Sequence, residues 1–308
     1  MLLRRFTDFV LQSRLHAMGT AFVIAFVPLI GGIGAVIAAL VTLRKGVFEG
    51  TVVMCATTVP YLLSVYHYPT TASIEFNIAL ISVGLIVASN ILTWVLATIS
   101  RRYDNWSFLL ELILVIGVFV VIVIHVSYPD IQRWWESELN SYLAKTTALM
   151  SGLTGDVPLN VAQAEAVSTI KHYATGLIAI SVLLNALFQL LLARGWQSII
   201  FNPRGLYDEL CQIRLNKAVA AVFIAGVAWA WSGSATALDL MVVVYAVFSL
   251  AGLSLIHSLV RDRNYSWIWL AVIYIGIVGL FPLSIKILSV IALLDVGMDF
   301  RKRFNLIG

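Results

Sequence analysis

The residues that could do chemistry in this chain are the few ionisable and polar side chains that interrupt its long apolar runs. Asp239 and Lys286 each lie near an end of such a run, and Asn77 lies near the end of another. Ionisable groups at membrane depth are costly and are therefore candidates for function. We treat Asn77, Asp239 and Lys286 as a candidate polar pocket that opens outward. The structural alternative is that Asp239 and Lys286 pair with each other or reach the membrane surface separately.

No sequence pattern indicates catalysis. The chain has no glycine-rich phosphate loop followed by lysine, no G-x-S-x-G and no H-E-x-x-H. His67, His125 and His172 fall at the expected outer surface, but their spacing matches no metal motif. A metal or proton site shared by the three is the less favoured alternative. Cys55 lies in an apolar run and Cys211 in a polar stretch, which argues against a disulfide. The sequence predicts no enzyme, no catalytic residue, no cofactor and no metal site.

The elements that hold these side chains are predicted to be membrane helices. Of the 308 residues, 60% are hydrophobic and only 12% are charged, whereas soluble domains carry about 25% charged residues. A bilayer core of about 30 Å is crossed by roughly 17–25 apolar residues in a helix. The backbone in lipid must satisfy its own hydrogen bonds, so these runs must be helical. We expect an all-α polytopic bundle within a single integral membrane domain, 1–308.

Eight runs are expected to span the membrane. They cover residues 47–66, 74–100, 108–127, 173–193, 218–231, 237–260, 267–281 and 283–296. The first run, 17–43, contains Pro28, Gly31, Gly32 and Gly34, which would break a helix in its middle. Basic residues stand on both sides of it, so we favour a broken hairpin that enters and returns over one span. This gives 8–10 membrane segments.

The distribution of basic residues predicts the orientation of the chain in the membrane. Of the 20 Lys and Arg residues, this topology places four outside, namely Arg133, Lys145, Lys171 and Lys286, which leaves 16 inside. Lys and Arg prefer the cytoplasmic side, so both termini are predicted to be cytoplasmic. The only long external segment, 128–172, carries a helical stripe with Trp134 and Trp135 and is expected to rest on the outer surface. A helix capped by Asn160 should follow and run on into the next span.

Stretch 195–217 is predicted to be a cytoplasmic turn and amphipathic helix. Asn202, Pro203 and Gly205 suit a turn, and acidic residues followed by Arg214 and Lys217 suit the helix dipole. In the C-terminal tail, Asp295, Asp299 and Arg303 recur every four residues and should line one side of a helix. We expect the tail carboxylates to anchor Arg204 or Arg214. The candidate cytoplasmic interaction site comprises Asn202, Pro203, Arg204, Glu209, Arg214, Asp295, Asp299 and Arg301.

A resemblance enters through these two stretches. FNPRGLYDELCQIRL (201–215), a later HSLV (257–260) and LLDVGMDFRKR (293–303) resemble the YybS-like family of bacterial membrane proteins. The resemblance implies a multi-pass protein of the bacterial inner membrane. It also implies a distant similarity to the substrate-binding membrane subunits of energy-coupling-factor transporters, which bind a vitamin or similar molecule and lack their own ATPase. Their small-residue first helix contacts a coupling subunit, and small-xxx-small pairs occur here at Gly31/Ala35 and Gly34/Ala38.

Two functions are carried forward from the sequence. The first is a transport-associated, substrate-binding membrane component. The second is a non-transporting scaffold that recruits an envelope or cytoplasmic partner. The expected partners are the lipid bilayer and a membrane or cytoplasmic protein. No clustered basic patch suits nucleic acid, and the sequence leaves open which small-molecule ligand is bound, if any.

The orientation can be tested with a reporter fused after Gly308 in bacterial cells. We expect a cytoplasmic reporter signal, because the basic residues at 301–303 follow the last apolar run. A matched fusion within the expected external segment, after residue 145, should report the opposite side. An extracytoplasmic signal from the Gly308 fusion would overturn the topology.

Overall fold

Helices make up the described structure. The computed structural model describes residues 2–27, 30–66, 73–154, 161–201, 205–263 and 265–305, and these ranges contain no strand. By contacts, the chain divides into two compact units. The first contains Met1–Leu109 and Ser181–Ile213, and the second contains Leu110–Ile180 and Arg214–Gly308. Helices α6 and α9 contribute residues to both units.

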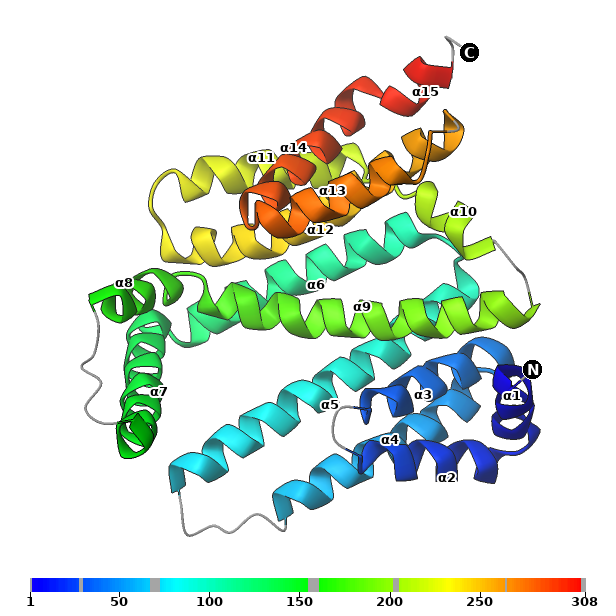
Figure 1. Ribbon diagram of the computed structural model, residues 1–308, viewed down its shortest axis with the longest axis horizontal. Helices are drawn as coiled ribbons and strands as arrows, with labels where there is room; N and C mark the ends of the chain where they lie inside the picture. Colours follow the sequence, from blue (N-terminus) through cyan, green and yellow to red (C-terminus); the bar gives the residue numbers. More distant parts are fainter. Residues whose placement is uncertain are drawn as a thin grey trace. The chain divides into compact units, whose positions relative to one another are not determined.

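The first unit combines the N-terminal helices with two helices from the middle of the sequence (Figure 1). They are α1 (Leu2–Gln12), α2 (Arg14–Ala25), α3 (Gly32–Lys45), α4 (Val47–Tyr66), α5 (Ser73–Arg102), most of α9 (Ala174–Phe201) and α10 (Gly205–Cys211). The second unit contains most of α6 (Trp106–Ser127), α7 (Ile131–Thr154), α8 (Val161–Ile170), α11 (Lys217–Ala230), α12 (Ala235–Asp262), α13 (Ile268–Gly279), α14 (Leu283–Met298) and α15 (Phe300–Asn305).

The N-terminal run is divided between two helices that pack against each other, as the sequence predicts, and its entry into and return from the membrane stays a prediction. Helix α2 ends at Ala25 and α3 begins at Gly32. The two arms pack face to face, since a Cβ added at Gly34 would lie 3.1 Å from the carbonyl oxygen of Ala21 and 2.7 Å from the Thr57 methyl carbon on α4. Gly34, Ala35 and Ala38 are buried. The small residues that could have docked another subunit therefore pack within this chain.

Within the described residues, five helices are long and apolar enough to cross a bilayer. They contain Val47–Tyr66, Ala79–Arg102, Trp106–Ser127, Ala174–Phe201 and Ala235–Asp262. These five match five of the eight expected spans and indicate a membrane protein. The other three runs form α11, α13 and α14 with 14, 12 and 16 residues. At 1.5 Å per residue these reach only about 18–24 Å, so the count of eight spans stays a prediction.

Three local expectations are wrong. Helix α8 ends at Ile170, and a turn at 171–173 separates it from α9, so it does not run on. Helix α10 ends at Cys211, short of Arg214, and Lys217 instead begins α11 behind the N-cap Asn216. Asp299 adopts a left-handed conformation (φ 51°) that ends α14. The tail residues therefore do not line one continuous helix. The expected cap Asn160 lies outside the described residues.

Helices α12 and α14 form the closest helix pair of the second unit. A Cβ added at Gly252 would lie 2.2 Å from the carbonyl oxygen of Leu288. The Ser289 hydroxyl on α14 lies 2.8 Å from the carbonyl oxygen of Tyr245 on α12. Small residues and hydroxyl hydrogen bonds are what hold helices together in lipid, where the hydrophobic effect gives no preference between helix and lipid contacts. The short helix α14 is thus fixed by a long neighbour.

This close approach can be tested with Gly252→Ala. The added methyl group would clash with backbone atoms, which cannot rotate away as a side chain can. Overpacking of this kind lowers the free energy of unfolding by about 1–3 kcal/mol. The matched control is Gly276→Ala on α13, where nothing lies within 4 Å of the added carbon. Denaturation in detergent, followed by circular dichroism, should show a loss of stability for the first variant alone. Equal stability of the two variants would contradict the packing.

Candidate functional site

A fully buried carboxylate lies on the longest helix of the second unit. Asp239 sits on the second turn of α12, and its side chain has no exposed surface. Its Oδ1 accepts a hydrogen bond of 2.7 Å from the backbone amide of Gly176, in the first turn of α9. A Cβ at Gly176 would lie 2.2 Å from the carbonyl oxygen of Asp239. Only glycine lets the start of α9 approach so closely, and the positive end of that helix then faces the carboxylate.

The second oxygen of this carboxylate faces a histidine. The Nε2 atom of His125, on α6, lies 3.2 Å from Oδ2 of Asp239, and the histidine side chain is only 7% exposed. This is an ion-pair distance, but neither atom has a partner in hydrogen-bond alignment. The other ring nitrogen, Nδ1, lies 3.0 Å from the backbone oxygen of Val121. The structure therefore joins α6, α9 and α12 at one carboxylate, which we call the Asp239 centre (His125, Thr175, Gly176 and Asp239).

Helix α7 and the turn before α9 also contact the Asp239 centre. The indole nitrogen of Trp135 donates to the Thr175 hydroxyl at 2.9 Å, and Lys171 pairs with Glu136 at 2.9 Å. His172, in the turn, interacts electrostatically with Asp239. The helix expected to rest on a membrane surface is thus attached to the Asp239 centre through its tryptophan.

The structure changes the partner expected for Asp239. Among the described residues it interacts with His125, His172, Thr175 and Gly176. Lys286 is exposed on α14 and makes no pair with it. The side chain of Asn77 lies outside the described part of the chain. A polar pocket shared by all three residues stays a prediction. Sequence reasoning did not select His125 for the site, although a histidine near the same end of an apolar run as Asp239 was a usable signal.

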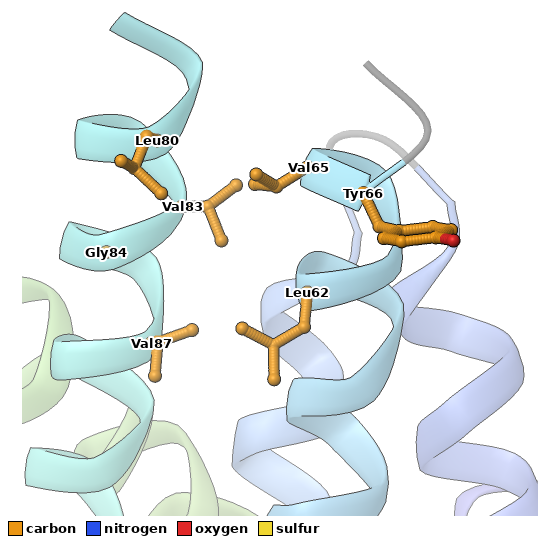
Figure 2. Close-up of a pocket in the computed structure, with 7 residues that line it drawn as sticks. All are labelled: Leu62, Val65, Tyr66, Leu80, Val83, Gly84 and Val87. Carbon is orange, nitrogen blue, oxygen red and sulfur yellow. The ribbon is translucent and has the colours of Figure 1, made fainter. Parts of the chain in front are cut away.

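The described groove of the first unit is apolar. Leu62, Val65 and Tyr66 on α4 and Leu80, Val83, Gly84 and Val87 on α5 line it, and its volume is about 560 Å³. Figure 2 shows Val65 and Val83 pointing toward each other across the space, and Leu62 toward Val87. Leu62 and Leu80 are half exposed. A groove with these walls suits hydrocarbon and offers little to a polar ligand.

Part of the candidate cytoplasmic interaction site forms one cluster. Arg214 pairs with Asp299 at 3.0 Å and donates to the backbone oxygen of Asp295 at 3.3 Å. Asp295 is buried, and its Oδ1 accepts from the backbone amide of Phe300 at 3.0 Å. Arg301 lies 3.8 Å from its other oxygen. The anchor expected between the tail carboxylates and Arg214 is present, and we call these residues the tail cluster (Arg214, Asp295, Asp299 and Arg301).

Electrostatics favour the ionised form of Asp299. Desolvation acts to raise its pKa, but hydrogen bonds and positive charge from Arg214 and Lys302 outweigh that effect and lower the pKa below the ordinary value. A carboxyl whose pKa is lowered in the folded state stabilises that state above its unfolded pKa. The contribution disappears as the pH falls through the lowered pKa.

Glu209 belongs to a separate cluster in the first unit. Its Oε2 accepts a hydrogen bond of 2.9 Å from the indole nitrogen of Trp106 and lies 3.4 Å from Arg194. Arg194 also pairs with Asp104. These contacts fix α10 against the ends of two long helices. Asn202, Pro203 and Arg204, the remaining members of the candidate interaction site, lie outside the described residues.

Polar side chains also join α5 to α9 in the first unit. The Asn185 amide donates to the Ser89 hydroxyl at 2.8 Å, and the Thr93 hydroxyl donates to Gln189 Oε1 at 2.5 Å. All four residues lie on long apolar helices. Because each contact is satisfied between helices, Asn185 and Gln189 serve as helix contacts, which is the commoner use of amides in membranes.

Long apolar helices with an ionisable centre buried among them define a helical membrane protein. No family model, curated protein or solved structure matches this chain. Within the described residues, no three His, Cys, Asp or Glu side chains are grouped so that they could hold a metal ion. The inference about function therefore depends on the Asp239 centre and the two charged clusters.

The tail cluster can be tested with Arg214→Gln, Asp299→Asn and the double variant. Asparagine is chosen because it tolerates the left-handed conformation at 299. We expect each single change to lower the Tm by a few degrees near neutral pH and the double change to lower it by less than their sum. The coupling should vanish at acid pH, once Asp299 is protonated.

The control is the equivalent set at Arg133 and Asp130, a pair 3.3 Å apart whose side chains are 84% and 77% exposed. Exposed pairs contribute little, so this cycle should show no coupling. Additive effects of the changes at Arg214 and Asp299 would show that their contact contributes nothing to stability.

Proposed function

We propose that this protein is a transport-associated component of the bacterial inner membrane with its functional centre at Asp239. One observation carries the proposal: a carboxylate with no exposed surface lies on a membrane-length helix, facing a histidine that is also buried. Such groups are expensive in lipid and usually mark pathways or binding sites. The YybS-like resemblance supports the same class, and the charge asymmetry supports cytoplasmic termini.

The arrangement of helices around the carboxylate supports a binding role. Three helices meet at the Asp239 centre, and a short turn at 171–173 connects it to α7 and α8. A ligand that competes for Asp239 would have to replace the contacts from Gly176 and His125. It would thereby loosen α6 and α9 from α12, so occupancy would be linked to helix position.

A scaffold without transport is the second candidate. It is favoured by the apolar walls of the described groove and by the many internal contacts of the charged residues. Under this alternative, the tail cluster would form part of a docking surface, and the Asp239 centre would serve only to hold helices together.

The two candidates separate on affinity purification of the full chain in mild detergent, with mass spectrometry of co-purifying proteins and small molecules. An ATPase partner together with a bound metabolite supports transport. A protein partner without any small molecule supports scaffolding. Asp239→Asn should reduce the bound metabolite about tenfold or more, because a hydrogen bond to a charged group contributes about 1.5–3 kcal/mol.

The matched control is Asp262→Asn at the other end of the same helix, where the carboxylate is partly exposed and lies beside Arg261. This variant should keep the metabolite at the wild-type level. If Asp239→Asn also keeps it while remaining folded, Asp239 is not part of a binding site for that molecule.

A further inference from the structure

The tautomer of His125 is set by its neighbour on α6. Nδ1 lies 3.0 Å from the backbone oxygen of Val121, one turn earlier in the same helix. A carbonyl oxygen accepts hydrogen bonds and cannot donate them. The hydrogen of the imidazole ring must therefore be on Nδ1. In the neutral ring, Nε2 then carries a lone pair and no hydrogen.

This tautomer creates a conflict at Asp239. Nε2 lies 3.2 Å from Oδ2 of the carboxylate, and the two side chains are 7% and 0% exposed. A neutral ring beside an ionised carboxylate would place two acceptors, Nε2 and Oδ2, in contact with no hydrogen between them. The Gly176 amide and the Thr175 hydroxyl are donors to the carboxylate, but both are uncharged, so the pair would carry a net negative charge among apolar helices.

We propose that Asp239 and His125 form a proton-binding site that holds one dissociable proton. The proton is on His125 as an imidazolium beside a carboxylate, or on Asp239 as a carboxylic acid beside an imidazole. Both forms give the pair no net charge and remove the contact between two acceptors. Loss of the proton leaves a single negative charge on the pair.

The groups around the site are consistent with a single proton. Helix α9 contributes the Gly176 amide to Oδ1 and the Thr175 hydroxyl, both uncharged. The turn before it contributes His172, which interacts with Asp239, and Lys171, whose charge is paired with Glu136 on α7. His125 is the titratable group in direct contact with the carboxylate. It is therefore the group that shares the proton.

Release of the proton would change the contacts that Asp239 makes with its neighbouring helices. Oδ1 of Asp239 holds the first turn of α9, Oδ2 faces α6, and both oxygens belong to α12. The inference rests on the site of the proposed function and adds what that site binds: a proton. A metabolite could fail to co-purify while the pair still held its proton, so the two tests fail independently.

The test uses the full chain in lipid nanodiscs with histidine labelled at both ring nitrogens. Nitrogen NMR distinguishes the imidazolium from the two neutral tautomers, and His125→Gln identifies the His125 signals by their loss. Infrared spectra with isotope-labelled aspartate report whether a carboxylic acid is present at neutral pH. The protonation states are read from the wild-type protein, and the variants assign the signals to His125 and Asp239.

Two results support the site. The first is an imidazolium at His125 near neutral pH that becomes neutral in Asp239→Asn. The second is a neutral ring with hydrogen on Nδ1, accompanied by an aspartic acid carbonyl band that Asp239→Asn removes. In either case raising the pH should release a single proton from the pair.

Two results overturn it. One is a neutral ring with its hydrogen on Nε2, which would then be the donor to an ionised carboxylate. The other is a neutral ring with hydrogen on Nδ1 and no aspartic acid band. The matched controls are His257→Gln and Asp262→Asn, both on α12. They should leave the His125 signals and the aspartic acid band unchanged.

Discussion

A carboxylate held away from water must be satisfied by the groups around it, and Asp239 shows what this demands of a fold. One oxygen takes an amide from the first turn of α9, and the other faces His125. The amide can reach the carboxylate only because residue 176 is glycine. The turn at 171–173 separates α8 from the first turn of α9. The indole nitrogen of Trp135 donates a hydrogen bond to the adjacent Thr175. Residues far apart in the sequence therefore act together to stabilise one buried carboxylate.

The same requirement, that polar groups in lipid find partners inside the protein, also explains the helix contacts elsewhere. Hydroxyl and amide side chains join α5 to α9, and a serine joins α14 to α12. Glycine permits the closest approaches, at Gly252 and at Gly50, where an added Cβ would lie 1.8 Å from the Thr42 hydroxyl. Dispersion and hydrogen bonding depend on such short distances. Helices too short to span a membrane by themselves are held by this packing.

Hydropathy and glycine placement predicted much of the secondary structure, including the break between α2 and α3, because both act locally along the chain. The run 218–231 matched α11 (Lys217–Ala230) to within one residue at each end. Helix α13 is three residues shorter than the run 267–281, since its ends depend on turns that the apolar pattern does not mark. The pairing of charged side chains between helices was the least predictable feature. The shared depth of Asp239 and Lys286 made a pair between them one alternative, yet Asp239 meets His125, because depth does not say which helices are neighbours. The left-handed Asp299 ended a helix that the four-residue spacing of charges had extended.

The groove between α4 and α5 has a consequence for how the first unit is solvated. Its walls are hydrocarbon side chains, several of them half exposed, around a space of about 560 Å³. Water in that space would find few hydrogen-bond partners, whereas an acyl chain would restore the contacts that a void forfeits. In a bilayer an acyl chain in this groove would complete the packing of these two helices. Its exchange for detergent would then change the interior of the first unit as well as its surroundings.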